Sequence, residues 1–379
     1  MNKLIYRYYD SKMSDSITSG KVFIIYGPRR VGKTTLIKKF LSGFSGKYYS
    51  GTGDDKLLRD VFESESIQKI KGAFSGYDLV VIDEAQRISN IGLGLKILID
   101  QLPDLKVIAS GSSSFELSSK IGEPLTGRQK IITLYPLSFL ELKEEYGPMH
   151  SMEMLESFLI YGMYPETITN DNTKDKIEYI TSLKNSYLFK DILELEDIRN
   201  SDKLLDLLKL ISFQIGKEVS LNELSTSLGL AKQTIERYLD LLEKAFVIKK
   251  VHGFSSGNLR KEVTKTCRYY FLDNGIRNAV INNFNPINLR DDIGMLWENF
   301  LFSERLKKQS YHKIYSNIYF WRTYDRKEID LVEERDGKLY GYEFKWGNKK
   351  VKEPALWKAT YSNAQYEVIT KENYLDFIC

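Results

Sequence analysis

The sequence predicts an α/β protein, and three observations lead to this fold class. An apolar run over residues 22–26 is followed by a glycine-rich loop and an amphipathic segment, which is the order strand, loop, helix. A second apolar run, 79–82, ends in two adjacent carboxylates, and ligand sites of open α/β sheets lie at such strand ends. Near the C-terminus, a predicted helix is followed by a strand and a hairpin, which adds a second α/β region.

Composition places the chain among ordinary globular proteins of several domains. It has 379 residues, of which 42% are hydrophobic and 28% charged, and its 55 basic and 51 acidic residues nearly cancel. Two cysteines exclude a disulfide framework and favour a reducing compartment. The apolar runs are too short to cross a bilayer, and the N-terminus lacks the apolar core of a signal peptide. We therefore expect a cytoplasmic protein with no membrane partner.

The first strand leads into the pattern G-x-x-x-x-G-K-[ST], a phosphate-binding loop. Its glycines let backbone N–H groups surround a phosphate chain at a helix N-terminus. Lys33 is predicted to reach the β- and γ-phosphates, and the Thr34 hydroxyl to bind Mg²⁺. The alternative is a glycine turn without a ligand, but the flanking strand and helix favour a nucleotide. The predicted binding residues are Gly27, Pro28, Arg29, Arg30, Val31, Gly32, Lys33, Thr34 and Thr35.

The carboxylates that follow the second strand, Asp83 and Glu84, complete a predicted hydrolase site. Asp83 is placed to hold Mg²⁺, and Glu84 to polarise the water that attacks the γ-phosphate. Small-molecule kinases also use a phosphate-binding loop but need no such second carboxylate, so the pair favours hydrolysis. The alternative is a solvated acidic turn.

Several segments together resemble the archaeal and bacterial AAA-type ATPases whose C-terminal half is a domain of unknown function. They are residues 26–36, 83–86, 111–114, 127–128 and 136–139. The resemblance spans nearly the whole chain and implies ATP and Mg²⁺ as ligands, but no single biological role. It also implies four parts: a P-loop core at 1–148, a helical lid at 149–200, a winged helix at 201–280 and a PD-(D/E)xK nuclease-like domain at 281–379.

Two further candidates in the core are a sensor and an arginine finger. A third strand, 106–109, is followed by hydroxyl residues, of which Ser112 is our candidate for the polar γ-phosphate sensor of AAA-type enzymes. Arg128 follows Gly127 and is a candidate arginine finger. A finger that reaches a neighbouring subunit would imply a ring or dimer. The alternative for Arg128 is a surface arginine at a turn.

The middle of the chain predicts a helix-turn-helix. Ser220 and Glu223 form a capping-box pattern that opens a helix ending at Gly229, and a second helix begins at Ala231 and carries apolar residues as far as Phe246. A strand, a turn and a strand follow, as in a wing. The free side of the second helix carries residue types that contact DNA phosphates and bases: Lys232, Gln233, Thr234 and Arg237. The alternative is a spacer that packs only against protein.

The C-terminal region carries a second predicted chemistry. Asp330 lies on one strand of a predicted hairpin, Glu343 and Lys345 share a face of the other, and Glu298 lies on the preceding helix. A metal-dependent phosphodiester hydrolase needs carboxylate ligands for Mg²⁺ and a lysine that orients or activates water. These are the positions of the PD-(D/E)xK pattern. The alternative is a hairpin with an ordinary salt bridge.

The predicted function is an ATPase whose hydrolysis drives or gates a DNA-directed C-terminal module. The competing hypothesis is a nucleotide-regulated switch that binds a partner and has an inactive nuclease-like domain. A third, phosphoryl transfer to a small molecule, would need an acceptor pocket that the sequence does not reveal.

Overall fold

The chain folds into two compact units. The computed structural model describes residues 4–111, 124–186, 201–255, 266–347 and 351–379. Residues 4–136 together with 244–246 form one unit, and 137–243 with 247–379 form the other. Below, these are called the N-terminal unit and the C-terminal unit.

The N-terminal unit is built on a parallel sheet of five strands in the order β2-β3-β4-β1-β5. Strand β1 lies between β4 and β5 and is buried along its whole length, which explains its uninterrupted apolar sequence. The elements of this unit are α1 (Met13–Ser16), β1 (Val22–Tyr26), α2 (Lys33–Ser42), β2 (Tyr48–Thr52), α3 (Lys56–Glu63), α4 (Ile67–Phe74), β3 (Leu79–Asp83), η1 (Ala85–Arg87), α5 (Ile91–Gln101), β4 (Lys106–Gly111) and β5 (Gln129–Thr133).

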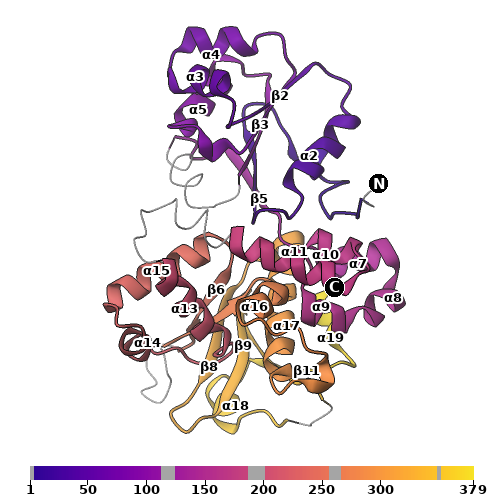
Figure 1. Ribbon diagram of the computed structural model, residues 1–379, viewed down its shortest axis with the longest axis vertical. Coiled ribbons are helices and arrows are strands. Elements are labelled where there is room, and N and C mark those ends of the chain that lie inside the picture. The colour runs from indigo at the N-terminus through magenta and orange to yellow at the C-terminus, as the bar shows by residue number, and fades with distance from the viewer. Residues whose placement is uncertain (1–3, 112–123, 187–200, 256–265, 348–350) are drawn as a thin grey trace. The chain divides into compact units, whose positions relative to one another are not determined.

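Helices cover both faces of this sheet. Figure 1 shows α3, α4 and α5 on one side and α2 on the other. The first face is closed by a continuous apolar core in which Ile24 and Val80 of the strands meet Phe62 and Leu95 of the helices. The carboxyl ends of β1, β3 and β4 therefore share one edge, where loops project from a rigid base.

The helices of the C-terminal unit fall into two runs along the chain. The first run contains α7 (Phe139–Tyr146), α8 (Pro148–Glu153), α9 (Leu155–Tyr161), α10 (Pro165–Thr169), α11 (Thr173–Ser186), α13 (Ser201–Ser212), α14 (Leu221–Leu228) and α15 (Lys232–Lys244). The second run contains α16 (Asn274–Val280), η3 (Ile287–Leu289), α17 (Ile293–His312), α18 (Ala355–Thr360) and α19 (Tyr374–Ile378).

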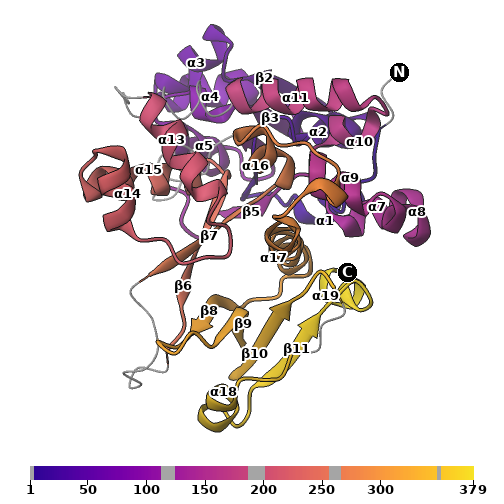
Figure 2. The ribbon, with the colours of Figure 1, turned by 60° about the horizontal axis from the view of Figure 1, so that its bottom comes forward.

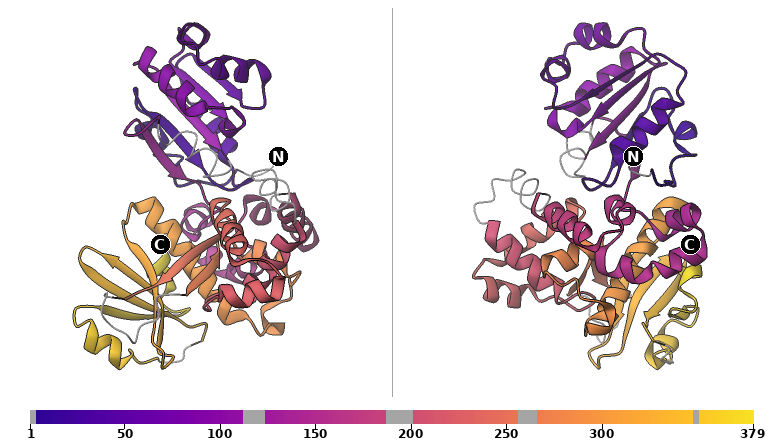
Figure 3. Two further views of the ribbon diagram at one scale, coloured as in Figure 1. Left: turned by 90° about the vertical axis from the view of Figure 1, so that its left-hand side faces the viewer. Right: turned by 45° about the vertical axis from the view of Figure 1, so that its right-hand side comes forward.

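The sheet of the C-terminal unit has six strands of mixed direction in the order β11-β10-β9-β8-β6-β7. Its strands are β6 (Ile248–Gly253), β7 (Cys267–Phe271), β8 (Asn317–Arg322), β9 (Glu328–Arg335), β10 (Lys338–Phe344) and β11 (Gln365–Ile369). Figure 2 shows α17 beside these strands, and Figure 3 shows their twist. The predicted hairpin is confirmed as β9 and β10, which are antiparallel and joined through Asp336 and Gly337.

The two strands predicted for the wing, β6 and β7, form an antiparallel pair that continues the same sheet. His252 and Gly253 of β6 pair in parallel with Tyr319 and Phe320 of β8. The predicted boundary between residues 280 and 281 therefore falls between strands of a single sheet.

The helix-turn-helix pair is present with its predicted cap. The Ser220 hydroxyl accepts a hydrogen bond from Glu223 N, and Gly229 ends α14 with φ 65°. One detail of the prediction is wrong. Helix α15 ends at Lys244, and Phe246 lies outside both the helix and the next strand with φ 59°. None of the described helices is both long and apolar enough to cross a membrane.

Candidate functional site

The loop between β1 and α2 is shaped by two glycines. A Cβ on Gly27 would lie 2.1 Å from the carbonyl oxygen of Leu134, so only glycine fits between β1 and the residue that follows β5. Gly32 caps α2 with φ 98°, a conformation in which a side chain is strained. The sequence therefore forms a loop that ends at a helix N-terminus, where unpaired N–H groups favour an anion.

Lys33 lies within this loop and is 6% exposed. Its Nζ donates hydrogen bonds to the carbonyl oxygens of Gly27 and Pro28, at 2.8 and 2.9 Å. The ammonium group is thus held over the loop by two backbone acceptors. A phosphate chain in the loop would offer it anionic acceptors, which form stronger hydrogen bonds than neutral carbonyls.

Asp83 at the end of β3 joins three parts of the site. Its Oδ2 accepts a hydrogen bond from Thr34 Oγ1 at 2.6 Å, and its Oδ1 accepts from the Ser110 hydroxyl. Ser110 lies one residue before the end of β4 and is fully buried. The predicted sensor, Ser112, lies outside the described residues. Sequence reasoning recognised this run of serines but not the contact of Ser110.

Glu84 follows Asp83 in a left-handed conformation, with φ 48°. A non-glycine residue in this region carries a strain of about 1 kcal/mol or more, and such strain is frequent at active sites. Its Oε2 accepts a hydrogen bond from the amide of Gln86, which is 5% exposed. The carboxylate beside Asp83 is therefore oriented by a buried side chain.

Arg7 supports the loop, and the sequence analysis missed it. Its Nη1 donates to the carbonyl oxygen of Val31 at 2.6 Å, and its Nη2 to that of Tyr135 at 2.8 Å. Asp10 holds the backbone of this segment, because its Oδ2 accepts from Arg7 N and from Lys39 Nζ. No local motif marks Arg7, since its partners are 24 and 128 residues away in sequence.

The residues present fit the Mg²⁺ of a magnesium nucleotide. Mg²⁺ prefers oxygen ligands and is commonly held by one or two protein oxygens together with phosphates and waters. The hydroxyl of Thr34 and the carboxylate of Asp83 offer such oxygens side by side, next to the phosphate-binding loop.

Arg128 lies far from this loop within its own unit. It directly precedes β5, and its carbonyl oxygen accepts from Val22 N, so it is at the amino end of the parallel strands. The loop is at their carboxyl end, a strand of five residues or about 16 Å away. The guanidinium is exposed and ion-paired with Asp100. A finger that acts on another chain stays a prediction.

Comparison with protein families agrees with this geometry. Residues 19–143 match the family described as AAA domain. This region is thus similar to AAA-type P-loop domains. Two families described as domains of unknown function follow, DUF8612 at residues 152–286 and DUF4143 at residues 293–375.

Three proteins that are similar to most of this chain are uncharacterized. One from Mycobacterium tuberculosis is 24% identical over 339 residues, which cover 88% of this chain and 72% of the relative. One from Methanocaldococcus jannaschii is 24% identical and covers 92% and 82% of the two chains. One from Haemophilus influenzae is also 24% identical and covers 82% and 79%. Proteins similar to this chain over most of its length therefore occur in bacteria and archaea.

Two solved structures show a distant likeness. AMPPCP-bound DnaA from Aquifex aeolicus has a TM-score of 0.28 and 13% identity, over 62% of this chain and 84% of that chain. A signal transduction ATPase with numerous domains from Pyrococcus horikoshii, which has a tetratricopeptide repeat sensor, has a TM-score of 0.29 and 14% identity, over 81% of this chain and 46% of its own. Likenesses this low carry no argument about the overall fold.

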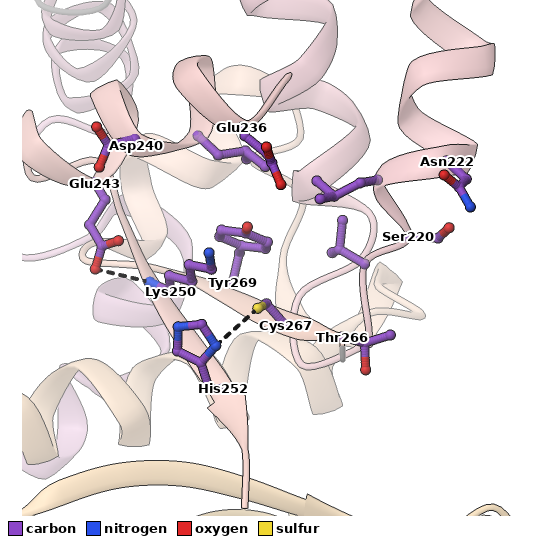
Figure 4. Close-up of a pocket in the computed structure, with 13 residues that line it drawn as sticks. Ser220, Asn222, Glu236, Asp240, Glu243, Lys250, His252, Thr266, Cys267 and Tyr269 are labelled. Atoms are coloured by element: carbon purple, nitrogen blue, oxygen red, sulfur yellow. Dashed lines mark hydrogen bonds between the residues drawn. The ribbon is translucent and has the colours of Figure 1, made fainter. Parts of the chain in front are cut away.

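The predicted DNA contacts lie on the outer side of α15. Lys232, Gln233 and Arg237 are exposed, and Thr234 is half-buried. The side that faces β6 and β7 borders a pocket of 490 Å³, which Figure 4 shows. Acidic side chains of α15 line this pocket, namely Glu236, Asp240 and Glu243. Lys232 precedes Glu236 by four residues, so the two lie on the same face of α15, and basic and acidic side chains share the exposed surface of this helix.

The four predicted nuclease residues are brought together in the C-terminal unit. Lys345 Nζ donates to Glu343 Oε1 at 2.6 Å, and Phe344 N donates to Asp330 Oδ2 at 2.8 Å. Glu298 of α17 is close enough to Asp330 for the charge of Asp330 to act on it. Burial raises the pKa of all three carboxyls above their ordinary values, and the charge of Asp330 adds to this for Glu298 and Glu343.

These residues do not fit a divalent metal as they stand. No three carboxylate, histidine or cysteine side chains of the described residues are grouped closely enough to hold a metal ion. A cation from the protein itself lies among the carboxylates instead. Arg268 of β7 is 1% exposed, and its guanidinium contacts Glu298, Asp330 and Glu328. The sequence analysis did not single out Arg268 for this site.

Proposed function

We propose that this protein is an ATPase, with its hydrolytic site in the AAA-type P-loop domain. The observation that supports this most directly is the contact of Asp83 with Thr34 and Ser110 at the end of the phosphate-binding loop. This contact joins Thr34, the residue after the loop lysine, to the carboxylate at the end of β3. ATP as the nucleotide rests on the match to the AAA domain family.

Each residue has a distinct role in the proposed reaction. The loop amides and Lys33 bind the phosphates, and Thr34 and Asp83 hold Mg²⁺, which when bound offsets phosphate charge. Glu84 accepts a proton from the attacking water while Gln86 keeps its carboxylate in place. Ser110 and Arg7 act indirectly, through Asp83 and the loop backbone.

Replacing the proposed base tests hydrolysis. Glu84→Gln keeps the shape of the side chain but removes its basicity, so we expect steady-state ATP turnover to fall by about 100-fold or more while ATP still binds. Glu65→Gln is a matched control, because Glu65 also has a positive φ, 51°, and accepts from a side-chain amide, that of Asn90. Equal turnover in the wild type and Glu84→Gln would contradict the proposal.

A second candidate is a nucleotide-regulated switch whose C-terminal unit binds a partner without cutting it. The observation that favours it over a coupled nuclease is the placement of Arg268 among the predicted metal ligands. A Mg²⁺- or Mn²⁺-dependent cleavage assay on single-stranded and duplex DNA tests the nuclease directly. Cleavage by the wild type that is abolished in both Asp330→Ala and Lys345→Ala would favour the nuclease and count against this switch.

DNA is the proposed partner of this switch, through the outer side of α15. Lys232→Ala together with Arg237→Ala should weaken duplex binding and lower the salt slope by about 0.9 for each DNA phosphate that the variant no longer neutralises. Lys209→Ala with Lys217→Ala removes the same charge from exposed positions outside α15 and should leave the slope unchanged. An unchanged salt slope in the α15 variant would show that this helix does not contact DNA phosphates.

A further inference from the structure

Arg268 is fixed among the carboxylates by contacts from several elements. Its Nη2 donates to Glu328 Oε2 at 2.8 Å, and its guanidinium lies 4.5 Å from the ring centroid of Phe320 on β8. Its Nη1 lies 3.8 Å from Glu298 Oε1 and 3.7 Å from Asp330 Oδ1. The positive charge thus lies between the helix carboxylate and the strand carboxylate that a metal would have to bridge.

Tyr270, two residues further along β7, extends to the same site because alternate strand residues share a face. Its hydroxyl donates to Glu298 Oε1 at 2.7 Å, and its ring stacks on Phe302 of α17 with centroids 4.0 Å apart. Strand β7 therefore supplies both a cation and a hydrogen-bond donor to Glu298.

One oxygen of each carboxylate that a metal would need already has a hydrogen-bond donor. Tyr270 occupies one oxygen of Glu298, the Phe344 amide one of Asp330, and Lys345 one of Glu343. Arginine keeps its charge at any pH a protein experiences. A divalent cation placed between Glu298 and Asp330 would therefore meet a permanent like charge within the same few ångströms.

The carboxylates still need positive charge, because buried acidic groups without a counter-ion are unstable as anions. Around the cluster, four acidic groups, Glu298, Asp330, Glu328 and Glu343, face two cations, Arg268 and Lys345. No described residue accepts a hydrogen bond from Arg268 Nε or Nη1, although both atoms are buried. The guanidinium is thus held in this position mainly by charge and by Glu328.

We propose that Arg268 serves as the resident cation of this carboxylate cluster, in place of a divalent metal, and that it keeps Mg²⁺ and Mn²⁺ out of the C-terminal unit. The inference deepens the second candidate function and is independent of ATP hydrolysis. It predicts that a change of one residue in β7, outside the D…E-x-K pattern, uncovers a metal site.

Titration of the full chain with Mn²⁺ in the absence of nucleotide tests this. Arg268→Met removes the charge but retains an apolar side chain of similar length, and we expect it to gain one bound Mn²⁺ per chain with at least tenfold tighter affinity than the wild type. Asp330→Asn added to Arg268→Met should abolish this binding. Arg322→Met is the matched control, since Arg322 is an arginine of the same sheet that pairs with Glu218, and it should behave like the wild type.

Two results would overturn the proposal. One is a folded Arg268→Met, shown by an unchanged circular dichroism spectrum, whose Mn²⁺ binding equals that of the wild type. The other needs no arginine variant: the wild type should bind the same number of Mn²⁺ ions as Asp330→Asn, and loss of an ion in Asp330→Asn would show that the wild-type cluster already takes a metal. A failed ATPase assay would affect neither result.

Discussion

The protein carries two sets of carboxylates, one in each unit, and the groups that surround them are of opposite kinds. In the N-terminal unit, Asp83 is partly exposed and contacted by hydroxyl groups, next to the phosphate-binding loop. In the C-terminal unit, Asp330 is buried and faces Arg268. Hydroxyl groups can share a cation with a carboxylate, whereas an arginine competes with that cation. A carboxylate motif therefore predicts a metal site only when the neighbouring positive charges are known.

The largest expected effect distinguishes the two aspartates directly. Asp83→Asn should lower Mg²⁺-dependent ATP turnover by about 100-fold or more, because it removes an anionic oxygen ligand of Mg²⁺. Asp330→Asn, the same change in the C-terminal unit, should leave turnover within about twofold of the wild type. Turnover that fell equally in both variants would show that the two sites are not separate in function.

A smaller effect is expected from the arginine of the N-terminal unit. Arg7→Ala should weaken binding of magnesium nucleotide about tenfold, since a hydrogen bond from a charged group is worth about 1.5–3 kcal/mol and Arg7 holds the backbone at Val31. Isothermal titration with an ATP analogue measures this. Lys39→Ala is the control, because it removes a more exposed charge on α2 that pairs with Asp10 of the Arg7 segment. Unchanged affinity in Arg7→Ala would show that the loop needs no such support.

Ser110→Ala should have a modest effect. It removes one donor to Asp83 but leaves Thr34 and the backbone, so turnover should fall by no more than about tenfold, at the lower end of what one hydrogen bond to a charged group contributes. Steady-state kinetics at varied magnesium concentration should show the loss mainly as weaker magnesium binding, that is, as a higher magnesium concentration for half-maximal turnover. A loss as large as that of Asp83→Asn would instead give Ser110 a role in the chemistry.

The smallest effect is a pH dependence of stability in the C-terminal unit. Burial and Asp330 raise the pKa of Glu298 from its ordinary 4.5 to about 8. Between these two values the folded chain retains a proton that the unfolded chain loses, so Glu298 lowers stability as pH rises from about 4.5 toward the raised pKa. Glu298→Gln cannot ionise, and its Tm should fall less than that of the wild type between pH 5 and 8, by a few degrees. Parallel Tm curves would contradict the raised pKa.

How much the sequence reveals differs between the two sites for a physical reason. The phosphate-binding loop and the Asp83–Glu84 pair are local patterns, and the parallel sheet places their strand ends together. Ser110 was missed in favour of Ser112 because the end of a strand is hard to locate within one residue. Arg7 contacts backbone carbonyls distant in sequence, and no side-chain pattern records such a contact.

In the C-terminal unit, the proximity of Asp330 to the strand of Glu343 and Lys345 follows from hairpin register and strand alternation, which are local rules that a sequence reveals. The approach of Arg268 depends on β7 joining the sheet through β6 and β8, a pairing between distant segments. The identity of the cation in a carboxylate cluster is a tertiary property, and the D…E-x-K pattern does not contain it.

The pairing of β6 with β8 has a consequence for dissecting the protein. A fragment that stops at residue 280 would retain β6 and β7 but lose β8 to β11, and it would expose the backbone edge of β6 and the buried ring of Tyr270 to water. Such a fragment should be prone to aggregate, and amide hydrogen exchange of the intact chain should show β6 and β9 opening together. The helix-turn-helix is thus attached to a sheet that unfolds as one cooperative unit. A change that destabilises one end of this sheet should therefore also destabilise the other end.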